Sequence, residues 1–163
     1  MRKIDFGQVA NSYANSREDI PVTLMDSLQL RNIFLDGKKV ADIGAGTGAL
    51  TRKMAMRNAD VVGIEPSQEL LKHASTMNRL KNFRIPYQQG TAEVTGLDDS
   101  QYDIVTVMRT WHWLDRPKAI QEMKRILKKQ GTLLVIDSGF LSGPPVVEKT
   151  FELLAKHVEG GLQ

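Results

Sequence analysis

The run VADIGAGTG, residues 40–48, constrains this chain more than any other feature of its sequence. Its first residues are apolar and predict a short buried parallel strand. The alternating glycines Gly44, Gly46 and Gly48 let the backbone turn sharply from that strand into a helix. Free N–H groups at the start of such a helix face whatever binds there. The sequence therefore predicts a ligand site at the carboxyl end of this strand.

Two kinds of adenosine-bearing cofactor suit this turn. The segment GAGTGA, residues 44–49, satisfies the dinucleotide fingerprint, and Glu65 follows at about the spacing expected for a ribose-binding acid. Strand alternation points Asp42 into the mouth, where a carboxylate repels the pyrophosphate of a dinucleotide but attracts the sulfonium and ammonium of S-adenosylmethionine. Alternatively, Asp42 accepts hydrogen bonds from the amides of the glycine loop.

The composition bounds the class of protein. The chain has 163 residues, 41% of them hydrophobic and 25% charged, which is typical of one soluble domain with a sizeable core. No apolar run is long enough for a signal peptide or a membrane span, so we expect a cytoplasmic protein. Cysteine is absent, which excludes disulfides and zinc–thiolate sites, and no metal site is predicted. The net charge of +3 is too mild to indicate a nucleic-acid partner.

Strand and helix patterns alternate along the chain, which predicts a doubly wound α/β fold with a parallel sheet. The predicted strands are residues 39–42, 61–65, 83–88, 102–108 and 132–137. The predicted helices are residues 21–35, 48–57 and 66–80, a helix that Pro117 opens and Gly131 follows, and a last amphipathic helix from Val147. The basic cluster of Lys124, Arg125, Lys128 and Lys129 is predicted to decorate a helix C-terminus.

From Asp5 to Gly139 the chain resembles the class I S-adenosylmethionine-dependent methyltransferases, within them the small-molecule group called methyltransferase type 11. The strongest elements are VADIGAGTG and VVGIEPS, residues 61–67, in which Glu65 matches the family's acid that accepts both ribose hydroxyls. The resemblance implies a Rossmann-like sheet in the order 3-2-1-4-5. Such sheets normally continue with a sixth and a seventh strand, which this sequence does not show.

The segment QGTAEVTGL, residues 89–97, resembles the stretch that lies along adenine in this family. Thr91 stands where most members have an acidic residue, which shifts the expected contacts toward Gln89, Ala92 and backbone groups. The N-terminal pattern of Tyr13 and Arg17, with Phe6 and Ala10, is similar to the segment that folds over the cofactor, with Arg17 as a cation for the methionine carboxylate. Alternatively, the aromatic residues pack the first helix.

The segment VMRTWHWLD, residues 107–115, resembles a subgroup that includes trans-aconitate methyltransferase-like proteins. In that subgroup a histidine, an aromatic residue and an acid lie beside the methyl donor. His112 is therefore the candidate catalytic residue: for an alcohol, phenol or ammonium acceptor it could take the proton that must leave, and otherwise it lines the site. For a carboxylate acceptor no proton is needed, and the Arg109 guanidinium could hold the carboxylate bidentately. Trp111 and Trp113 either wall the substrate or pack under the next helix.

The resemblance implies a set of cofactor-binding residues spread over the chain. They are Tyr13, Arg17, Asp42, Gly44, Ala45, Gly46, Gly48, Glu65, Pro66, Thr91, Ala92, Met108 and Arg109. The predicted function is methyl transfer from S-adenosylmethionine to a small molecule. The alternatives are an NAD(P)-dependent oxidoreductase and a cofactor-binding fragment with little turnover. We expect residues 1–163 to form a single domain, either truncated at its C-terminus or pairing its fifth-strand edge with a second copy.

Overall fold

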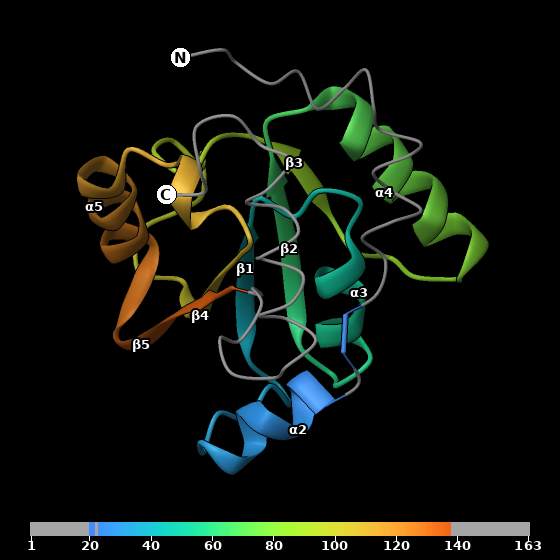
Figure 1. Ribbon diagram of the computed structural model, residues 1–163, viewed down its shortest axis with the longest axis horizontal. Coiled ribbons are helices and arrows are strands. Elements are labelled where there is room, and N and C mark those ends of the chain that lie inside the picture. The colour runs from blue at the N-terminus through green and yellow to red at the C-terminus, as the bar shows by residue number, and fades with distance from the viewer. Residues whose placement is uncertain (1–19, 22, 138–163) are drawn as a thin grey trace, which may run out of the picture.

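The computed structural model describes residues 20–21 and 23–137, which form a parallel sheet in the predicted order β3-β2-β1-β4-β5 (Figure 1). The strands are β1 (Lys39–Ile43), β2 (Asp60–Glu65), β3 (Tyr87–Gln89), β4 (Tyr102–Met108) and β5 (Leu127–Ile136). The helices are α2 (Thr23–Leu30), α3 (Ala49–Ala55), α4 (Gln68–Leu80), α5 (Arg116–Ile126) and the short 3-10 helix η1 (Trp111–Trp113). The last predicted helix, from Val147, lies outside the described residues.

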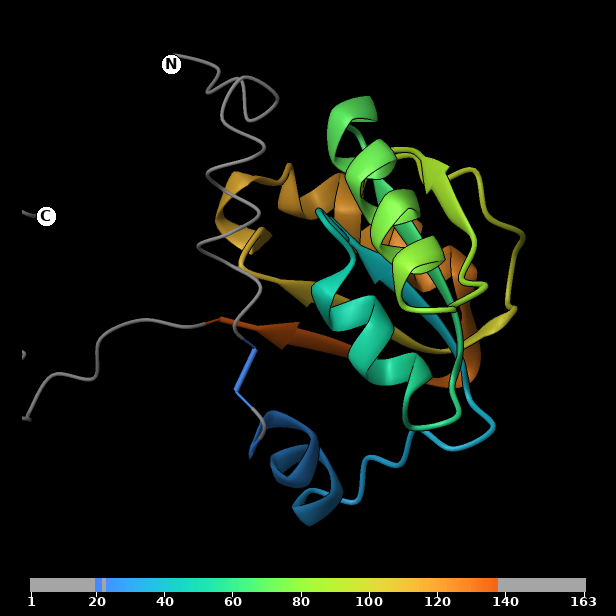
Figure 2. The same ribbon diagram turned by 90° about the vertical axis from the view of Figure 1, so that its right-hand side faces the viewer.

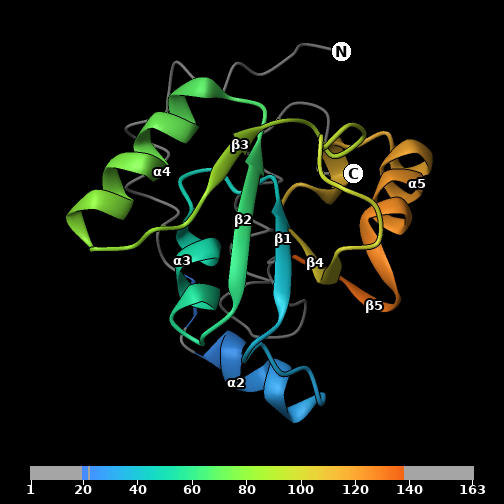
Figure 3. The same cartoon turned by 180° about the vertical axis from the view of Figure 1, so that it is seen from behind.

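Helices cover both faces of the sheet, with α3 and α4 on one face and α5 on the other (Figure 2). Consecutive strand residues such as Val40 and Ala41 are therefore both buried, on opposite faces. Val40 belongs to the core under α2 and α3, and Ala41 to the core under α5. Seen from behind, α2 lies beyond the end of the sheet at which β1 begins (Figure 3). Within the described part of the chain, no helix is long and apolar enough to cross a membrane.

The predicted strand over residues 83–88 is wrong in its extent, because the chain uses most of these residues to end α4. The Phe83 N–H bonds to the Asn78 carbonyl at 2.9 Å, and the Asn78 side chain donates to the Ile85 carbonyl at 2.8 Å. Pro86 has no N–H to offer a neighbouring strand. Pairing with β2 therefore begins only at Tyr87, opposite Gly63.

The boundary between α5 and β5 lies earlier than the sequence predicts. The helix ends at Ile126 instead of continuing toward Gly131, because Leu127 takes extended backbone angles and joins the sheet. Lys128 and Lys129, predicted to decorate the helix C-terminus, lie instead on β5. The Lys128 ammonium contacts the Asp103 carboxylate of β4 at 2.9 Å.

The helix predicted over residues 21–35 is also shorter, since α2 ends at Leu30. Asn32 adopts a φ of 59°, and the Ile33 N–H bonds back to the Leu28 carbonyl at 3.0 Å. This left-handed residue closes the helix in the way that asparagine commonly does at a helix C-terminus. Phe34 therefore lies beyond the helix, in the connection to β1.

Glu122 of α5 fixes the long loop between β3 and β4. Its Oε1 accepts hydrogen bonds from the N–H and the hydroxyl of Thr95, at 2.8 and 2.5 Å. Arg125 donates to both carboxylate oxygens and also pairs with Asp99. Hydrogen bonds from Arg125 and Thr95 outweigh partial burial and lower the pKa of Glu122 to about 2. The loop that carries Thr91 and Ala92 is thus anchored to the rest of the fold by this carboxylate.

We predict that Glu122→Gln lowers the free energy of unfolding by about 1–3 kcal/mol at pH 7, because it removes charge-assisted hydrogen bonds. The folded pKa lies below the ordinary value of 4.5, so this stabilisation is complete above about pH 4.5 and is lost as the pH falls toward 2. Urea unfolding at pH 7 and pH 3 measures the difference. Asp60→Asn, at an exposed carboxylate, is the control. An equal loss at both pH values would contradict the assignment.

Candidate functional site

The glycine turn after β1 is as sharp as the sequence predicts. Gly44, Gly46 and Gly48 have φ values of 72°, 57° and 78°, which side chains with a Cβ rarely tolerate. The N–H groups of Gly44 and Ala45 donate to the Ile64 carbonyl of β2, at 2.8 and 3.0 Å. The turn is thereby held against the second strand, and α3 starts directly after Gly48.

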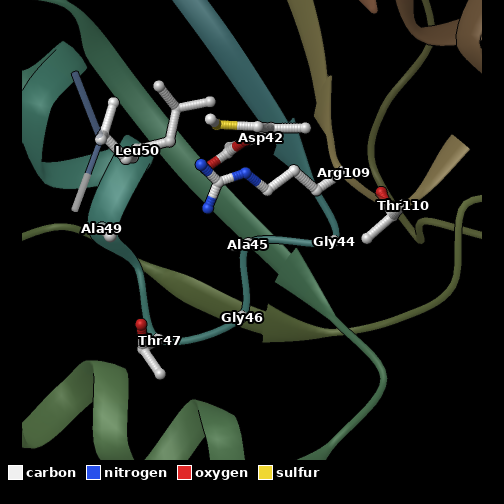
Figure 4. Close-up of a pocket in the computed structure, with 11 residues that line it drawn as sticks. Asp42, Gly44, Ala45, Gly46, Thr47, Ala49, Leu50, Arg109 and Thr110 are labelled. Carbon is white, nitrogen blue, oxygen red and sulfur yellow. The ribbon is translucent and has the colours of Figure 1, made fainter. Parts of the chain in front are cut away.

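A cleft opens beside this turn (Figure 4). Of the predicted cofactor-binding residues, the structure brings six together in its lining: Asp42, Gly44, Ala45, Gly46, Met108 and Arg109. Ile20, Thr47, Ala49, Leu50 and Thr110 complete the lining. Beside Gly46 the space is open, since a Cβ built there would have the Gly44 carbonyl oxygen, at 4.0 Å, as its nearest neighbour. A ligand can therefore approach the backbone of the turn closely.

Asp42 lies under this cleft with 2% of its surface exposed. Its Oδ2 accepts a hydrogen bond from the Thr51 hydroxyl of α3 at 2.6 Å, and its Oδ1 accepts one from the Thr106 hydroxyl of β4 at 2.8 Å. The alternative prediction, that loop amides hold this carboxylate, is wrong because hydroxyls do so. Burial raises the pKa of Asp42 to about 6, although the two hydroxyls oppose the shift.

Glu65, at the end of β2, joins the second strand to the glycine turn. Its Oε2 accepts a hydrogen bond from the Gly46 N–H at 3.0 Å, and its Oε1 accepts one from the Ser67 N–H at 2.9 Å. Burial raises the pKa of this carboxyl. Each oxygen of a carboxylate can accept more than one hydrogen bond, so both remain able to accept from a ligand. Pro66, the next residue, is exposed.

The underside of the turn is built from residues that the sequence analysis missed. A Cβ on Gly48 would lie 2.1 Å from the Tyr87 hydroxyl, and one on Gly63 would lie 2.5 Å from the Tyr87 ring. Arg52, buried in α3, donates to the Thr47 carbonyl at 2.7 Å. The signal for Tyr87 was Gly63, because a glycine inside an apolar strand leaves space for a neighbour.

Thr106 carries the second hydroxyl that bonds to Asp42, and the sequence held a signal for it. It is the polar residue within the apolar run of residues 104–108. The segment YDIVTVM places Thr106 where β4 is fully buried, and the sheet register sets it directly opposite Asp42. A buried hydroxyl needs a hydrogen-bond partner, so its presence predicts a polar group on the adjacent strand. Thr51 carries no comparable signal, because only the packing of α3 against the sheet brings it to Asp42.

Other predicted site residues lie outside the lining of the cleft. Thr91 is exposed, and its hydroxyl oxygen accepts a hydrogen bond from the Val94 N–H at 3.2 Å. Ala92 is buried in the core under α5. His112 is exposed on η1, with its ring 4.9 Å from that of Trp113. Tyr13 and Arg17, like Phe6 and Ala10, lie outside the described residues.

Arg109 follows directly on β4 with a φ of 58°. This left-handed conformation costs about 1–3 kcal/mol for a residue that carries a long side chain. Its side chain extends into the cleft from the end of β4 (Figure 4). The next residue, Thr110, packs against the turn, since a Cβ on Gly44 would lie 2.9 Å from its side chain. Among the described residues, no group of three or more metal-binding side chains occurs.

Comparison with known proteins gives consistent matches. The model of a family described as methyltransferase domain, of type 11, matches residues 41–135. An uncharacterized methyltransferase of Mycobacterium tuberculosis is 35% identical over 130 residues, which are 80% of this chain and 50% of that protein. A ubiquinone biosynthesis O-methyltransferase of Glaesserella parasuis is 33% identical over 144 residues, 80% of this chain and 60% of that protein. The chain spans about half the length of the first of these relatives.

Solved structures show the same fold. The YcgJ protein of Bacillus subtilis superposes with a TM-score of 0.62 and 29% identity, over 78% of this chain and 56% of that one. A SAM dependent methyltransferase from Aquifex aeolicus superposes with a TM-score of 0.68 and 22% identity, over 95% of this chain and 88% of that one. The five-stranded sheet and its strand order are therefore those of Rossmann-like methyltransferases.

We predict that Asp42→Asn stabilises the ligand-free protein at pH 8 by up to about 3 kcal/mol, because it removes an ionised carboxylate from a buried site. The folded pKa of about 6 lies above the ordinary 3.8, so the wild type loses stability as the pH rises from about 4 through 6. Urea unfolding at pH 5 and pH 8 measures this slope, which the variant should lack. A variant that is equally destabilised at both pH values would show that Asp42 is needed for the fold in its ionised form.

Proposed function

The chain belongs to the type 11 methyltransferase-domain family, and we propose on this premise that it transfers a methyl group from S-adenosylmethionine to a small-molecule acceptor. S-adenosylmethionine is the cofactor, which decides against the nicotinamide dinucleotide that the glycine turn alone leaves open. The cofactor supplies a methyl group already activated by the sulfonium. The protein then has to align the acceptor with that methyl group and exclude water.

One observation carries this proposal: a buried carboxyl lies under a glycine turn that leaves open space. Asp42 lines the cleft beside Gly46, where nothing fills the position of a Cβ. A carboxylate there favours a cationic ligand and disfavours a pyrophosphate. The fit to a cofactor with a sulfonium and an ammonium follows from this charge.

Glu65 supports the same cofactor. Its carboxylate is hydrogen-bonded to the Gly46 N–H, so an adenosine that reaches the turn also reaches Glu65. We propose that Glu65 accepts the two ribose hydroxyls, that Pro66 and Thr91 lie along the adenine, and that Ala92, whose side chain is in the core, meets the adenine with its backbone. The Gln89 side chain donates a hydrogen bond to the Pro66 carbonyl at 3.1 Å and accepts one from the Gln68 side chain at 3.1 Å. These bonds fix the position of Pro66 at the proposed adenine surface. Tyr13 and Arg17 remain proposed contacts to the methionine end.

The acceptor side of the site lies at η1. His112 is exposed there, beside Trp113, which is 49% exposed, while Trp111 packs against the core. For an alcohol, phenol or ammonium acceptor, we propose that the His112 imidazole takes the departing proton. The likeness of residues 107–115 to trans-aconitate methyltransferase-like proteins remains a prediction about this acceptor.

The edge of the sheet bears on the assembly. In the described part of the chain β5 pairs with β4, and Val135 on β5 is 45% exposed. We propose that residues 1–163 act as one domain and that a further strand, or β5 of a second copy, adds at this edge. The cofactor cleft is built by β1, β2, β4 and α3, so cofactor binding does not depend on that addition.

We predict that S-adenosylhomocysteine raises the melting temperature of the protein, because a ligand that binds only the folded state stabilises it. NAD and NADP should leave the melting temperature unchanged, since their pyrophosphate would meet Asp42. Differential scanning fluorimetry with each ligand at equal concentration makes the comparison. An equal shift with NAD would contradict the proposed function.

We also predict that Gly46→Val abolishes binding of S-adenosylhomocysteine in calorimetry, because the side chain fills the open space beside the turn. Gly37→Val is the matched control, since Gly37 has a φ of 65° and nothing within 4 Å of its Cβ position, but lies away from the cleft. Both variants should lose at least about 1–2 kcal/mol of stability through backbone strain. Loss of binding in both would show that strain, and not the cleft, is responsible.

A further inference from the structure

Arg109 and Asp42 are the two charged side chains in the described lining of the cleft. The Asp42 carboxyl lies at the bottom of the cleft, where two hydroxyls hold it. Arg109 enters the site at the point where β4 passes into η1, and its side chain extends across the cleft toward Asp42 (Figure 4). The cleft is thus bipolar, with an acid that suits the cationic part of a ligand and a guanidinium that suits an anionic part.

The backbone of Arg109 directs its side chain into the cleft. Along a regular strand, consecutive side chains point to opposite faces of the sheet, so Met108 and Arg109 should not share a cavity. Both nevertheless line the same cleft. The φ of 58° at Arg109 breaks the alternation, and its N–H is fixed to the Ile136 carbonyl at 2.9 Å. Thr110, the residue that follows Arg109, packs against Gly44.

The surroundings of the guanidinium suit an anion with two oxygens. Leu50, Ile20 and Met108 supply apolar walls, which strengthen a charged hydrogen bond by excluding water. A guanidinium presents a planar fork of N–H donors that matches a carboxylate bidentately. An unfavourable backbone conformation that aims such a fork into a ligand cleft indicates a functional role.

We propose that Arg109 is a carboxylate-binding residue of this cleft. The carboxylate belongs either to the amino-acid end of the cofactor or to the acceptor, and in both cases the chemistry is the same bidentate pair. This inference rests on the proposed function for the identity of the cofactor. It adds a specificity-determining residue: ligands that carry a carboxylate at this position bind, and the corresponding amides or esters do not.

The test uses three variants of the full chain. Arg109→Asn removes the charge but suits a positive φ, and its melting temperature, measured beside that of the wild type, shows whether the variant is folded. Arg109→Lys keeps the charge and loses the fork. Arg84→Asn, at an exposed arginine in the connection before β3, is the control for the change in net charge. Loss of binding in Arg109→Asn, in a variant that is still folded at the temperature of the titration, cannot be explained by unfolding or by net charge.

Calorimetry compares S-adenosylhomocysteine with 5′-methylthioadenosine, which lacks the amino-acid end. If Arg109 binds the cofactor's carboxylate, Arg109→Asn weakens S-adenosylhomocysteine by roughly tenfold to a hundredfold and leaves methylthioadenosine unchanged. Arg109→Lys should lose less than Arg109→Asn. Equal weakening of both ligands would overturn the proposal, because it would place Arg109 at the adenosine or in the fold.

A second arm tests the acceptor as the source. Benzoate, succinate and citrate, each beside its amide or methyl ester, are titrated into the ligand-free and the S-adenosylhomocysteine-loaded protein at constant ionic strength. If Arg109 binds an acceptor carboxylate, the wild type and Arg84→Asn prefer the acids, and Arg109→Asn loses that preference while it still binds S-adenosylhomocysteine normally. No effect of Arg109→Asn in either arm would overturn the proposal. A wild type that binds carboxylates but not S-adenosylhomocysteine would contradict the proposed function alone.

Discussion

The buried carboxyl of Asp42 is the interaction on which the site depends. It lies on β1, and the hydroxyls of Thr51 and Thr106 join it to α3 and to β4. Three elements, of which β4 is distant in sequence from the other two, therefore meet at one acid. Burying a carboxylate is unfavourable unless its oxygens are hydrogen-bonded. The pKa of Asp42 stays raised because the two hydroxyls offset only part of the desolvation penalty. The glycine turn and the cleft are built directly above this junction.

A second set of contacts holds the turn from the side and from below. Glu65 accepts a hydrogen bond from the Gly46 N–H, and the Ile64 carbonyl accepts two more from the start of the turn. Tyr87 lies against Gly48 and Gly63. Any side chain at these two positions would collide with the Tyr87 ring or its hydroxyl. The backbone at the mouth is thus fixed before any ligand arrives, which lowers the entropic cost of binding. The same contacts leave the ligand-facing side of Gly46 open.

The strained residue of the site has a place in this arrangement. Arg109 adopts a positive φ at the carboxyl end of β4, directly after a strand whose residues Ile104–Val107 are buried. Parallel α/β sheets bind ligands at the carboxyl ends of their strands, because the loops that follow neighbouring strands converge there. A rigid sheet can hold an unfavourable conformation at one loop residue and so direct one cation toward the cleft. Asp42 and Arg109 then set the charge pattern that a ligand must match.

The sequence by itself determined the α/β class, the glycine turn and the position of β4, because these follow from hydrophobic periodicity and from residues that act locally. It placed Asp42 and Glu65 at the ends of their strands for the same reason. The strand order was implied by the resemblance of the chain to a known family. The tertiary structure decided what surrounds these two acids: that hydroxyls hold Asp42, that Tyr87 supports the turn, and that Met108 and Arg109 face one cleft. It also decided where β5 begins, because the pairing of Leu127 with β4 joins distant segments. The ends of α2 and α4 depend on local hydrogen bonds around Asn32 and Asn78, which hydrophobic periodicity does not show. Long-range contacts carry no period in the sequence, so only the folded chain reveals them.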